Sequence, residues 1–183
     1  MVNVLVTGGA GFIGSNFVRY AIAAHADWRI TTLDKLTYAG RVENLEGLLD
    51  HPRHELIKGD IADPSVAAPL VQQSDLVVHF AAETHVDRSI ANAGNFITTD
   101  VFGTFVLLEA ARQARALRRF VQISTDEVYG SVAEGSSRET DELRPRNPYS
   151  ASKAGADRLA YSYWATYQVP VVITRASNNY GPY

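Results

Sequence analysis

Short aliphatic and β-branched runs alternate along this chain with longer segments whose apolar residues recur at helical spacing. The short runs are apolar at nearly every position, which is typical of strands covered on both faces of a parallel sheet. They predict strands at residues 3–6, 29–33, 54–57, 76–80, 120–123 and 171–174. The longer segments predict helices at residues 12–24, 64–72, 93–116 and 148–167. This alternation indicates consecutive βαβ units and therefore an α/β fold.

The last predicted helix also carries a start signal, with Asn147 as its N-cap and Pro148 in its first turn. The longest polar connection, residues 132–146, is expected to be an ordered loop rather than a boundary between domains. No repeat or low-complexity linker interrupts the pattern. We therefore expect residues 1–183 to form one domain.

A glycine-rich segment, TGGAGFIG at residues 7–14, follows the first predicted strand and opens the first predicted helix. Gly9, Gly11 and Gly14 satisfy the GxGxxG pattern, and Gly8 adds the GxxGxxG spacing. Glycine allows the sharp turn and the close approach of backbone N–H groups to a pyrophosphate at the helix N-terminus. A tight turn alone would also explain the glycines, but the strand and helix around them favour dinucleotide binding. The expected fold is a Rossmann-type doubly wound parallel sheet flanked by helices.

Asp34 ends the second strand, 20 residues after Gly14, where a carboxylate can accept hydrogen bonds from the adenosine ribose hydroxyls. A 2′-phosphate would be repelled there, so the sequence favours NAD over NADP. Lys35 weakens this argument, although it is equally well explained as a solvated loop cation. Asp60 and Ile61 follow the third strand, where an adenine edge would pass, and Asp60 could equally cap a turn.

Composition excludes several classes of partner and site. A net charge of -3 and a pI near 5.9 provide no basic surface, so neither nucleic acid nor an anionic membrane is an expected partner. No apolar run approaches the roughly 20 residues of a membrane helix. The absence of cysteine excludes disulfides and thiolate metal sites, and no metal site is predicted. Together with the lack of a signal-peptide pattern, it predicts a cytoplasmic protein.

Tyr149 and Lys153 lie four residues apart in the last predicted helix, so their side chains project from one face. The ammonium group is expected to lower the phenol pKa, so that a tyrosinate can take a proton from a sugar hydroxyl. Such a pair also occurs by chance on helix surfaces, but its place after a nucleotide-binding half favours a function. Thr125 follows the fifth strand, and its hydroxyl is expected to hydrogen-bond with Tyr149 and substrate.

Asp126 and Glu127 come directly after Thr125, at the same strand end. Two neighbouring carboxyl groups repel each other when both are ionised, so we expect their pKa values to separate. One group could then act as an acid and the other as a base at adjacent carbons. A polar loop with a capping Asp126 and a solvated Glu127 is the alternative, and composition does not exclude it.

Several segments together make a family resemblance plain. They are TGGAGFIG, LDKLTYAG, GDI, FAAETHVDRSI, STDEVYG, PYSASKA and SNNYGPY. Over essentially its whole length, the chain resembles the N-terminal part of dTDP-glucose 4,6-dehydratases, which belong to the extended short-chain dehydrogenase/reductase superfamily. The resemblance implies an NAD-binding Rossmann domain that carries the catalytic residues. It also implies that the C-terminal nucleotide-sugar-binding region, and with it most of the substrate domain, lies outside this sequence.

The activity that the resemblance implies is an NAD-dependent hydro-lyase reaction on a nucleotide sugar. Tyr149 would deprotonate the glucose 4-hydroxyl while carbon 4 is oxidised. Glu127 would then remove the carbon 5 proton while Asp126 protonates the departing 6-hydroxyl, and water would leave. Return of hydride to carbon 6 and of a proton to carbon 5 would give dTDP-4-keto-6-deoxyglucose. The cofactor would be regenerated without leaving the protein.

The same resemblance assigns the site residues. Thr84, Thr125 and Asn178 are expected to contact substrate. His85 is expected to be structural, and Asp87 and Arg88 are expected to form a local ion pair. The residues expected to line NAD are Gly8, Gly11, Phe12, Ile13, Gly14, Asp34, Lys35, Leu36, Thr37, Asp60, Ile61, Phe80, Ala81, Ala82, Glu83, Thr99, Tyr149, Lys153 and Asn179.

Other functions remain open at this point. Another nucleotide-sugar enzyme, such as an epimerase, a decarboxylase or a dehydratase of GDP- or CDP-sugars, would share the glycine-rich and Tyr/Lys motifs. A non-catalytic NAD-binding module would keep the glycines, but would have no need for Tyr149, Lys153, Asp126 and Glu127 together. The helices beginning at Ala93 and Pro148 resemble those that pair two subunits in this superfamily, so a homodimer through a four-helix bundle is expected.

Overall fold

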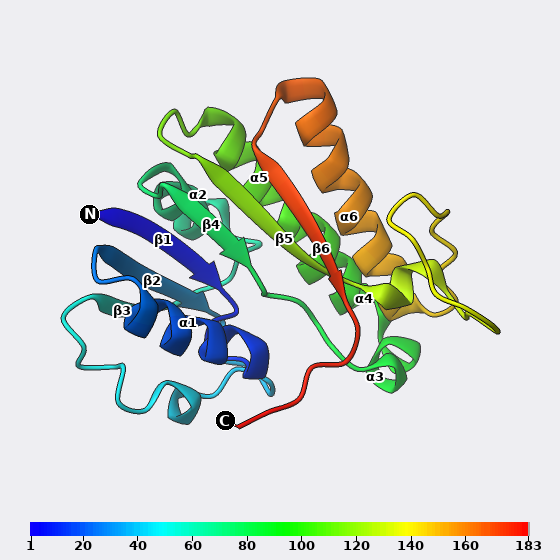
Figure 1. Cartoon of the computed structure of the whole chain (residues 1–183), viewed down its shortest axis with the longest axis horizontal. Coiled ribbons are helices and arrows are strands. Elements are labelled where there is room, and N and C mark those ends of the chain that lie inside the picture. The colour runs from blue at the N-terminus through cyan, green and yellow to red at the C-terminus, as the bar shows by residue number, and fades with distance from the viewer. Residues whose placement is uncertain (183) are drawn as a thin grey trace.

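The structure is a computed structural model that describes residues 1–182. Its centre is a parallel sheet whose strands lie in the order β3-β2-β1-β4-β5-β6 (Figure 1). The order reverses between β1 and β4, which is the doubly wound Rossmann arrangement expected from the sequence. The strands are β1 (Val2–Thr7), β2 (Trp28–Asp34), β3 (His54–Lys58), β4 (Leu76–His79), β5 (Arg119–Thr125) and β6 (Val171–Ala176).

Helices cover both faces of the sheet. In Figure 1, α1 (Phe12–Ala24) lies in front of the sheet, and α2 (Pro64–Gln72), α5 (Thr104–Gln113) and α6 (Pro148–Tyr167) lie behind it. Alternate residues of each strand point to opposite faces, so the sheet divides the apolar core into two clusters. Val4, Val6 and Val78 pack on the α1 side, whereas Leu5 and Phe120 pack on the other.

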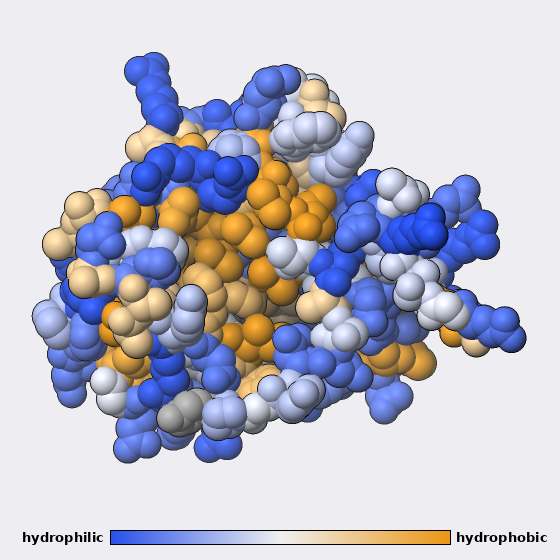
Figure 2. All heavy atoms as spheres, viewed as in Figure 1, coloured by the Kyte–Doolittle hydropathy of each residue, from blue (hydrophilic) through white to orange (hydrophobic). Residues whose placement is uncertain are grey.

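The front of β5 and β6 is less well covered. Within residues 1–182, Figure 1 shows no helix over this part of the sheet, and Figure 2 shows hydrophobic side chains at the surface there. Val121 and Ile123 of β5 are only half-buried, and Val172 of β6 keeps 40% of its surface exposed. None of the helices among these residues is long and apolar enough to cross a membrane.

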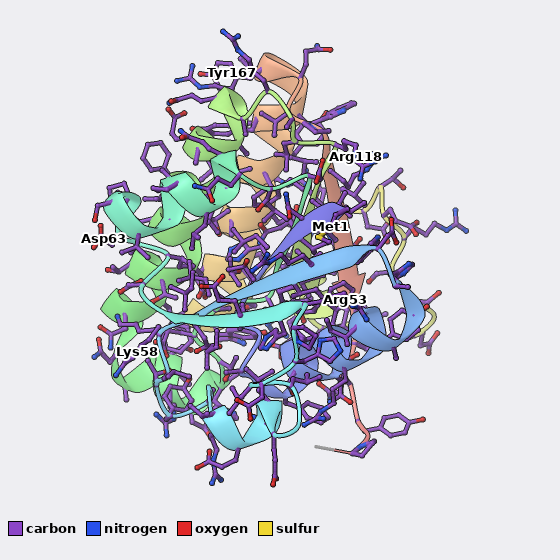
Figure 3. The ribbon with its side chains drawn as sticks, turned by 90° about the vertical axis from the view of Figure 1, so that its left-hand side faces the viewer. Met1, Arg53, Lys58, Asp63, Arg118 and Tyr167 are labelled. Carbon is purple, nitrogen blue, oxygen red and sulfur yellow. The ribbon has the colours of Figure 1, made fainter. Side chains whose placement is uncertain are left out.

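Capping groups fix the ends of the helices around the sheet. Asp63, labelled in Figure 3 near the start of α2, accepts a hydrogen bond from the Ser65 amide at 2.9 Å. Asn147 and Ser150 form a reciprocal capping box at the start of α6, as the N-cap prediction required. Arg53, also labelled in Figure 3, donates to the Ile22 carbonyl near the end of α1 at 2.8 Å.

The prediction of one regular helix over residues 93–116 was wrong, because the helix is interrupted by a π-helical segment and ends earlier. The chain forms α4 (Ala93–Phe96), a π-helical segment η2 (Ile97–Gly103) and α5, which ends at Gln113. The backbone at Ala114 is extended, because the chain must turn there to bring Leu117 into the core before β5 begins. Apolar spacing did not reveal the π-helical segment, because its seven residues are too few to show a period of their own.

Three short elements also escaped prediction because they are too short to show a period. They are η1 (Val42–Leu45), α3 (Val86–Ala91) and η3 (Asp126–Tyr129). The segment η3 follows β5 directly, and Thr125 caps it by accepting a hydrogen bond from the Glu127 amide at 3.2 Å. Two of the predicted catalytic residues therefore lie on a helical turn rather than in an open loop.

Candidate functional site

A cavity of about 520 Å³ opens at the carboxyl ends of the strands, where α/β folds place their ligands. It receives residues from the segments that follow all six strands and from the start of α6. Most of the residues expected from the sequence line it. They are Gly8, Gly11, Phe12, Ile13, Gly14, Asp34, Lys35, Thr37, Asp60, Ile61, Phe80, Ala81, Ala82, Glu83, Thr84, Thr99, Thr125, Glu127, Tyr149, Lys153, Asn178 and Asn179.

The glycine-rich turn is packed too tightly for side chains. Gly8 has a φ of +70°, and a Cβ there would lie 2.5 Å from the Ala81 amide nitrogen. A Cβ on Gly14 would lie 2.3 Å from the Gly8 carbonyl oxygen. The turn leads into α1, whose N-cap, Gly11, has no side-chain acceptor for the first-turn amides. Those N–H groups can therefore hold an anionic ligand.

Asp34 is buried at the end of β2, with 8% of its surface exposed. Its carboxylate accepts hydrogen bonds from the amides of Ala10, at 2.9 Å, and Leu36, at 2.8 Å. A Cβ on Gly40 would lie 2.3 Å from Asp34 Oδ1, so the loop after β2 folds directly over the carboxylate. These contacts hold the Asp34 side chain in one position at the edge of the cavity.

Asp60 has both of the roles that the sequence allowed. Its Oδ1 accepts a hydrogen bond from the Ala62 amide at 2.9 Å, which is the turn-capping role. Its Oδ2 pairs with Lys35 Nζ at 2.6 Å, and both residues line the cavity. The ion pair links the loops after β2 and β3. Lys35 is therefore not simply a solvated cation.

Two predicted site residues lie outside this cavity wall. The side chain of Leu36 packs against the apolar cluster on the α1 side of the sheet. Asp126 lines a neighbouring cavity, together with Arg175 and Ser177. The two carboxylates of Asp126 and Glu127 thus diverge from consecutive positions of η3 rather than facing one site.

Sequence reasoning missed part of the cavity wall. Gly40 and Ser177 adjoin segments that had been singled out, and Ser124 precedes Thr125, so their neighbours were the available signal. His85, expected to be structural, also reaches the wall. The missed residues are Leu33, Ala39, Gly40, Gly59, His85, Ile123, Ser124, Ala176 and Ser177.

A layer of buried polar side chains lies next to the cavity. His79 Nδ1 is 2.6 Å from Thr7 Oγ1, and Nε2 is 3.0 Å from Thr104 Oγ1. Thr104 donates its own proton to the Asp100 carbonyl, so this network assigns the proton of His79 to Nε2. Burial, aided by the charge of Lys153, lowers the pKa of His79 to about 3, so the ring stays neutral.

Asp100 belongs to the same layer and lies in the π-helical segment. Its carboxylate accepts hydrogen bonds from the Glu83 amide at 2.7 Å and from Ser152 Oγ at 2.6 Å. Burial raises the pKa of Asp100 to about 6, although the charge of Lys153 and both hydrogen bonds oppose the rise. A buried carboxylate thus anchors the loop that carries Glu83 to helix α6.

The expectation that Lys153 lowers the pKa of Tyr149 was wrong for this structure. Lys153 Nζ instead donates to the Ile123 carbonyl at 2.7 Å, and burial lowers its own pKa. Burial, followed by the negative charges of Glu127 and Asp100, raises the pKa of Tyr149 to about 12. The predicted hydrogen bond with Thr125 is present and opposes this rise. The phenol is therefore protonated in the free protein at neutral pH.

Comparison with known protein families shows to which family the chain belongs. The family model described as GDP-mannose 4,6 dehydratase matches residues 5–183. The chain belongs to this family. Among curated relatives, it is 56% identical over 181 residues to the low-salt glycan biosynthesis protein Agl12 of Haloferax volcanii. It is 50% identical over 186 residues to a dTDP-glucose 4,6-dehydratase of Streptomyces niveus. These matches cover 99% and 100% of the chain, but 58% and 55% of the relatives' lengths.

Solved structures agree with the family and the fold. The dTDP-glucose 4,6-dehydratase DesIV of Streptomyces venezuelae, solved with NAD bound, superposes with a TM-score of 0.94 at 51% identity. The match covers 99% of this chain and 57% of DesIV. The dTDP-glucose 4,6-dehydratase of Bacillus anthracis, also in complex with NAD, gives a TM-score of 0.90 at 44% identity. That match covers 100% of this chain and 57% of the Bacillus anthracis chain.

The raised pKa of Asp100 gives a testable dependence of stability on pH. In the unfolded chain Asp100 loses its proton near pH 4, and in the folded chain near pH 6, so its ionisation destabilises the fold progressively across this window. Asp100→Asn should remove that effect. The free energy of unfolding, variant minus parent, should rise by about 2 kcal/mol between pH 4 and pH 7 in denaturant titrations.

Asp50→Asn is the matched control, because Asp50 is exposed and does not line the cavity. Its difference from the parent should stay nearly constant across the same pH range. If the free-energy difference between Asp100→Asn and the parent also stays constant over this pH range, the pKa of Asp100 is not raised by folding, and the prediction is contradicted.

Proposed function

We propose that this chain binds NAD in the cavity at the strand ends and supplies the catalytic residues of a dTDP-glucose 4,6-dehydratase. The proposed reaction converts dTDP-glucose to dTDP-4-keto-6-deoxyglucose and water. One observation carries the proposal: a single cavity joins the glycine-rich turn and Asp34 to Thr125, Glu127 and Tyr149. Identity of about half to dehydratases, including structures solved with NAD, supports it.

The residues of the cavity fit a dinucleotide. The amides at the start of α1 suit its pyrophosphate, and the fixed carboxylate of Asp34 suits ribose hydroxyls. Ser124 also lines the cavity, and its buried Oγ has no hydrogen-bond partner among the described residues. A buried hydroxyl without a partner is costly, so a ligand in this cavity would satisfy it. Asn179, Thr99 and Phe80 complete the wall around the proposed cofactor.

Tyr149 is the proposed base for the sugar 4-hydroxyl. When bound, NAD would supply the oxidation of carbon 4 and the later re-reduction at carbon 6, and its cationic nicotinamide ring would favour the tyrosinate. The hydrogen bond between Thr125 and Tyr149 assists in the same direction. The buried Lys153 holds the start of α6 to the Ile123 carbonyl at the end of β5, and thereby positions Tyr149 at the cavity wall.

Glu127 and Asp126 are proposed to carry out the elimination once carbon 4 is a ketone. The ketone makes the carbon 5 proton acidic, and Glu127 faces the cavity where it can take that proton and return it to carbon 5 when hydride is returned to carbon 6. Asp126 is proposed to protonate the departing 6-hydroxyl from the adjoining cavity. That cavity shares Ser177 with the first, and Thr125 Oγ1 hydrogen-bonds Asp126 Oδ1 at 3.3 Å. Thr84 and Asn178 are proposed to contact the sugar.

The division of labour between Tyr149 and Glu127 can be separated experimentally in the complete protein. Tyr149→Phe should lower the rate of keto-sugar formation by about 10²–10⁴-fold, because the base for oxidation is lost. Glu127→Gln should allow oxidation but block elimination. Reduced cofactor should then accumulate, seen by its absorbance, after dTDP-glucose is added.

Tyr20→Phe is the matched control, because Tyr20 is an exposed tyrosine on α1 that lines neither cavity. It should keep the parent rate. Parental turnover by Glu127→Gln would contradict the proposed role of Glu127. Failure of the parent protein to convert dTDP-glucose, with conversion of a UDP- or GDP-sugar instead, would contradict the choice of substrate.

We further propose that the protein forms a homodimer through a four-helix bundle built from η2, α5 and α6. Exposed hydrophobic side chains gather on these helices, which is unusual for a surface facing water. Ile97 and Phe102 of η2 are 54% and 47% exposed, and Phe105 of α5 is 39% exposed. Tyr161 and Trp164 of α6 are 48% and 52% exposed.

The absence of cysteine supports the cytoplasm as the proposed compartment of the protein.

Charged residues at the proposed interface should break the dimer. Phe102→Glu combined with Phe105→Glu should convert the complete protein from dimer to monomer in sedimentation experiments. Tyr20→Glu, which alters an exposed aromatic residue on α1 across the sheet, should leave the dimer intact. A monomeric parent, or a double variant that remains dimeric, would contradict the proposed interface.

A further inference from the structure

Two loops line the cavity, and one side chain connects them. The loop after β2 contributes Lys35, Thr37, Ala39 and Gly40, and the loop after β4 contributes Glu83, Thr84 and His85. Tyr38 lies in the middle of the first loop but does not line the cavity. Its side chain reaches the second loop instead.

The Tyr38 hydroxyl uses both backbone polar groups of Thr84. It donates to the Thr84 carbonyl at 3.0 Å and accepts from the Thr84 amide at 3.1 Å. Thr84 Oγ1 lies 3.4 Å from the same oxygen. One phenol thus fixes the backbone of a residue 46 positions further along the chain. Because Thr84 also lines the cavity, these bonds set the distance between two of its walls.

Arg88 covers the ring of Tyr38. Its guanidinium carbon lies 3.7 Å from the ring centroid, which is a close cation–π contact. The ion pair between Asp87 and Arg88 that the sequence suggested is absent from the ion pairs of residues 1–182. Arg88 is therefore engaged with the loop after β2 rather than with its own neighbour.

The backbone next to this contact is strained. His85 has a φ of +75°, a backbone angle that residues other than glycine rarely adopt. Such a conformation persists only where the surroundings hold it, and it is concentrated at functional sites. Tyr38 holds Thr84 on one side of His85, and Arg88 lies three residues beyond it. Without these two contacts, the loop after β4 would be free to relax away from the cavity.

We propose that Tyr38 and Arg88 form a latch that retains the dinucleotide. This inference rests on the proposed function, in which the cofactor is regenerated in every turnover and gains nothing by leaving. Gly40 folds against Asp34, so the latched loop lies over the residue assigned to the ribose. Tyr38 is thus a positioning residue, because it acts through the two cavity walls and does not line the cavity itself.

Opening the latch should be the step that limits release of the cofactor. Tyr38→Phe keeps the ring beneath Arg88 but removes both hydrogen bonds to Thr84. We expect reduced NAD to dissociate from the complete protein about tenfold faster, as measured by the loss of its fluorescence after mixing with excess NAD. The Thr84 amide should exchange hydrogen faster, whereas amides of β1 should be unchanged. Tyr20→Phe, on α1, should match the parent in both measurements.

Arg88→Gln is the second variant, and it keeps the Tyr38 hydroxyl. It should also release reduced NAD faster than the parent, and it tests the latch if Tyr38→Phe fails to fold. Parental dissociation rates in both variants would overturn the latch, even if the Thr84 amide exchanges faster. Failure of the parent itself to bind reduced NAD would overturn the proposed function instead, so the two failures are distinguishable.

Discussion

The connections that leave β1 and β4 run to opposite faces of the sheet, and the rest of the site depends on this divergence. After β1 the chain enters α1 in front of the sheet, and after β4 it passes through α3 and α4 to α5 behind it (Figure 1). Two neighbouring parallel strands therefore end without a segment closing the space between them. The glycine-rich turn can occupy this space because Gly8 approaches the Ala81 backbone at the end of β4.

Around this opening, the chain buries polar groups that an apolar core would normally exclude. His79, Asp100 and Lys153 are each less than 9% exposed, and each has a hydrogen-bond partner within the protein. Their charges are set by burial, which keeps His79 neutral and raises the pKa of Asp100. Networks of this kind fix a single arrangement, because any lost partner leaves a costly unsatisfied group. The network of His79, Asp100 and Lys153 therefore holds the backbone next to the cavity in one conformation.

The electrostatics of Tyr149 fit a site that becomes active only when loaded. Burial and the charges of Glu127, Asp100 and Asp126 all favour the neutral phenol. Lys153 instead donates a hydrogen bond to the end of β5. A cation bound in the cavity would oppose those carboxylates. In the proposed enzyme, the oxidised cofactor provides that charge, so the base would form only where the electron acceptor is already present. The proposed latch at Tyr38 would keep the cofactor in place between turnovers, so that the charge on which Tyr149 depends stays in the cavity.

Sequence patterns predicted those features whose causes are local. The bounds of α1, α2 and α6 were confirmed because their apolar periods, Asn147 and Pro148 mark them directly. The glycine-rich turn and Asp34 were also placed correctly, because the spacing along a βαβ unit fixes them in space.

Features that depend on distant contacts could not be predicted. Leu36 turns into the core, and Asp126 turns into a second cavity, because of how η3 and the loop after β2 pack. The contacts of Tyr38 with Thr84 and Arg88 have no periodic signature. A four-residue spacing alone could not show whether the Lys153 ammonium group contacts Tyr149 or the Ile123 carbonyl.

A structure of the complete protein with NAD bound tests the central claim most directly. The account predicts the adenosine ribose against Asp34, the pyrophosphate at the amides that follow Gly11, and the nicotinamide beside Tyr149. Ser124 Oγ should gain a hydrogen-bond partner. NAD bound elsewhere on the protein, or a nicotinamide directed away from Tyr149 and Glu127, would contradict it.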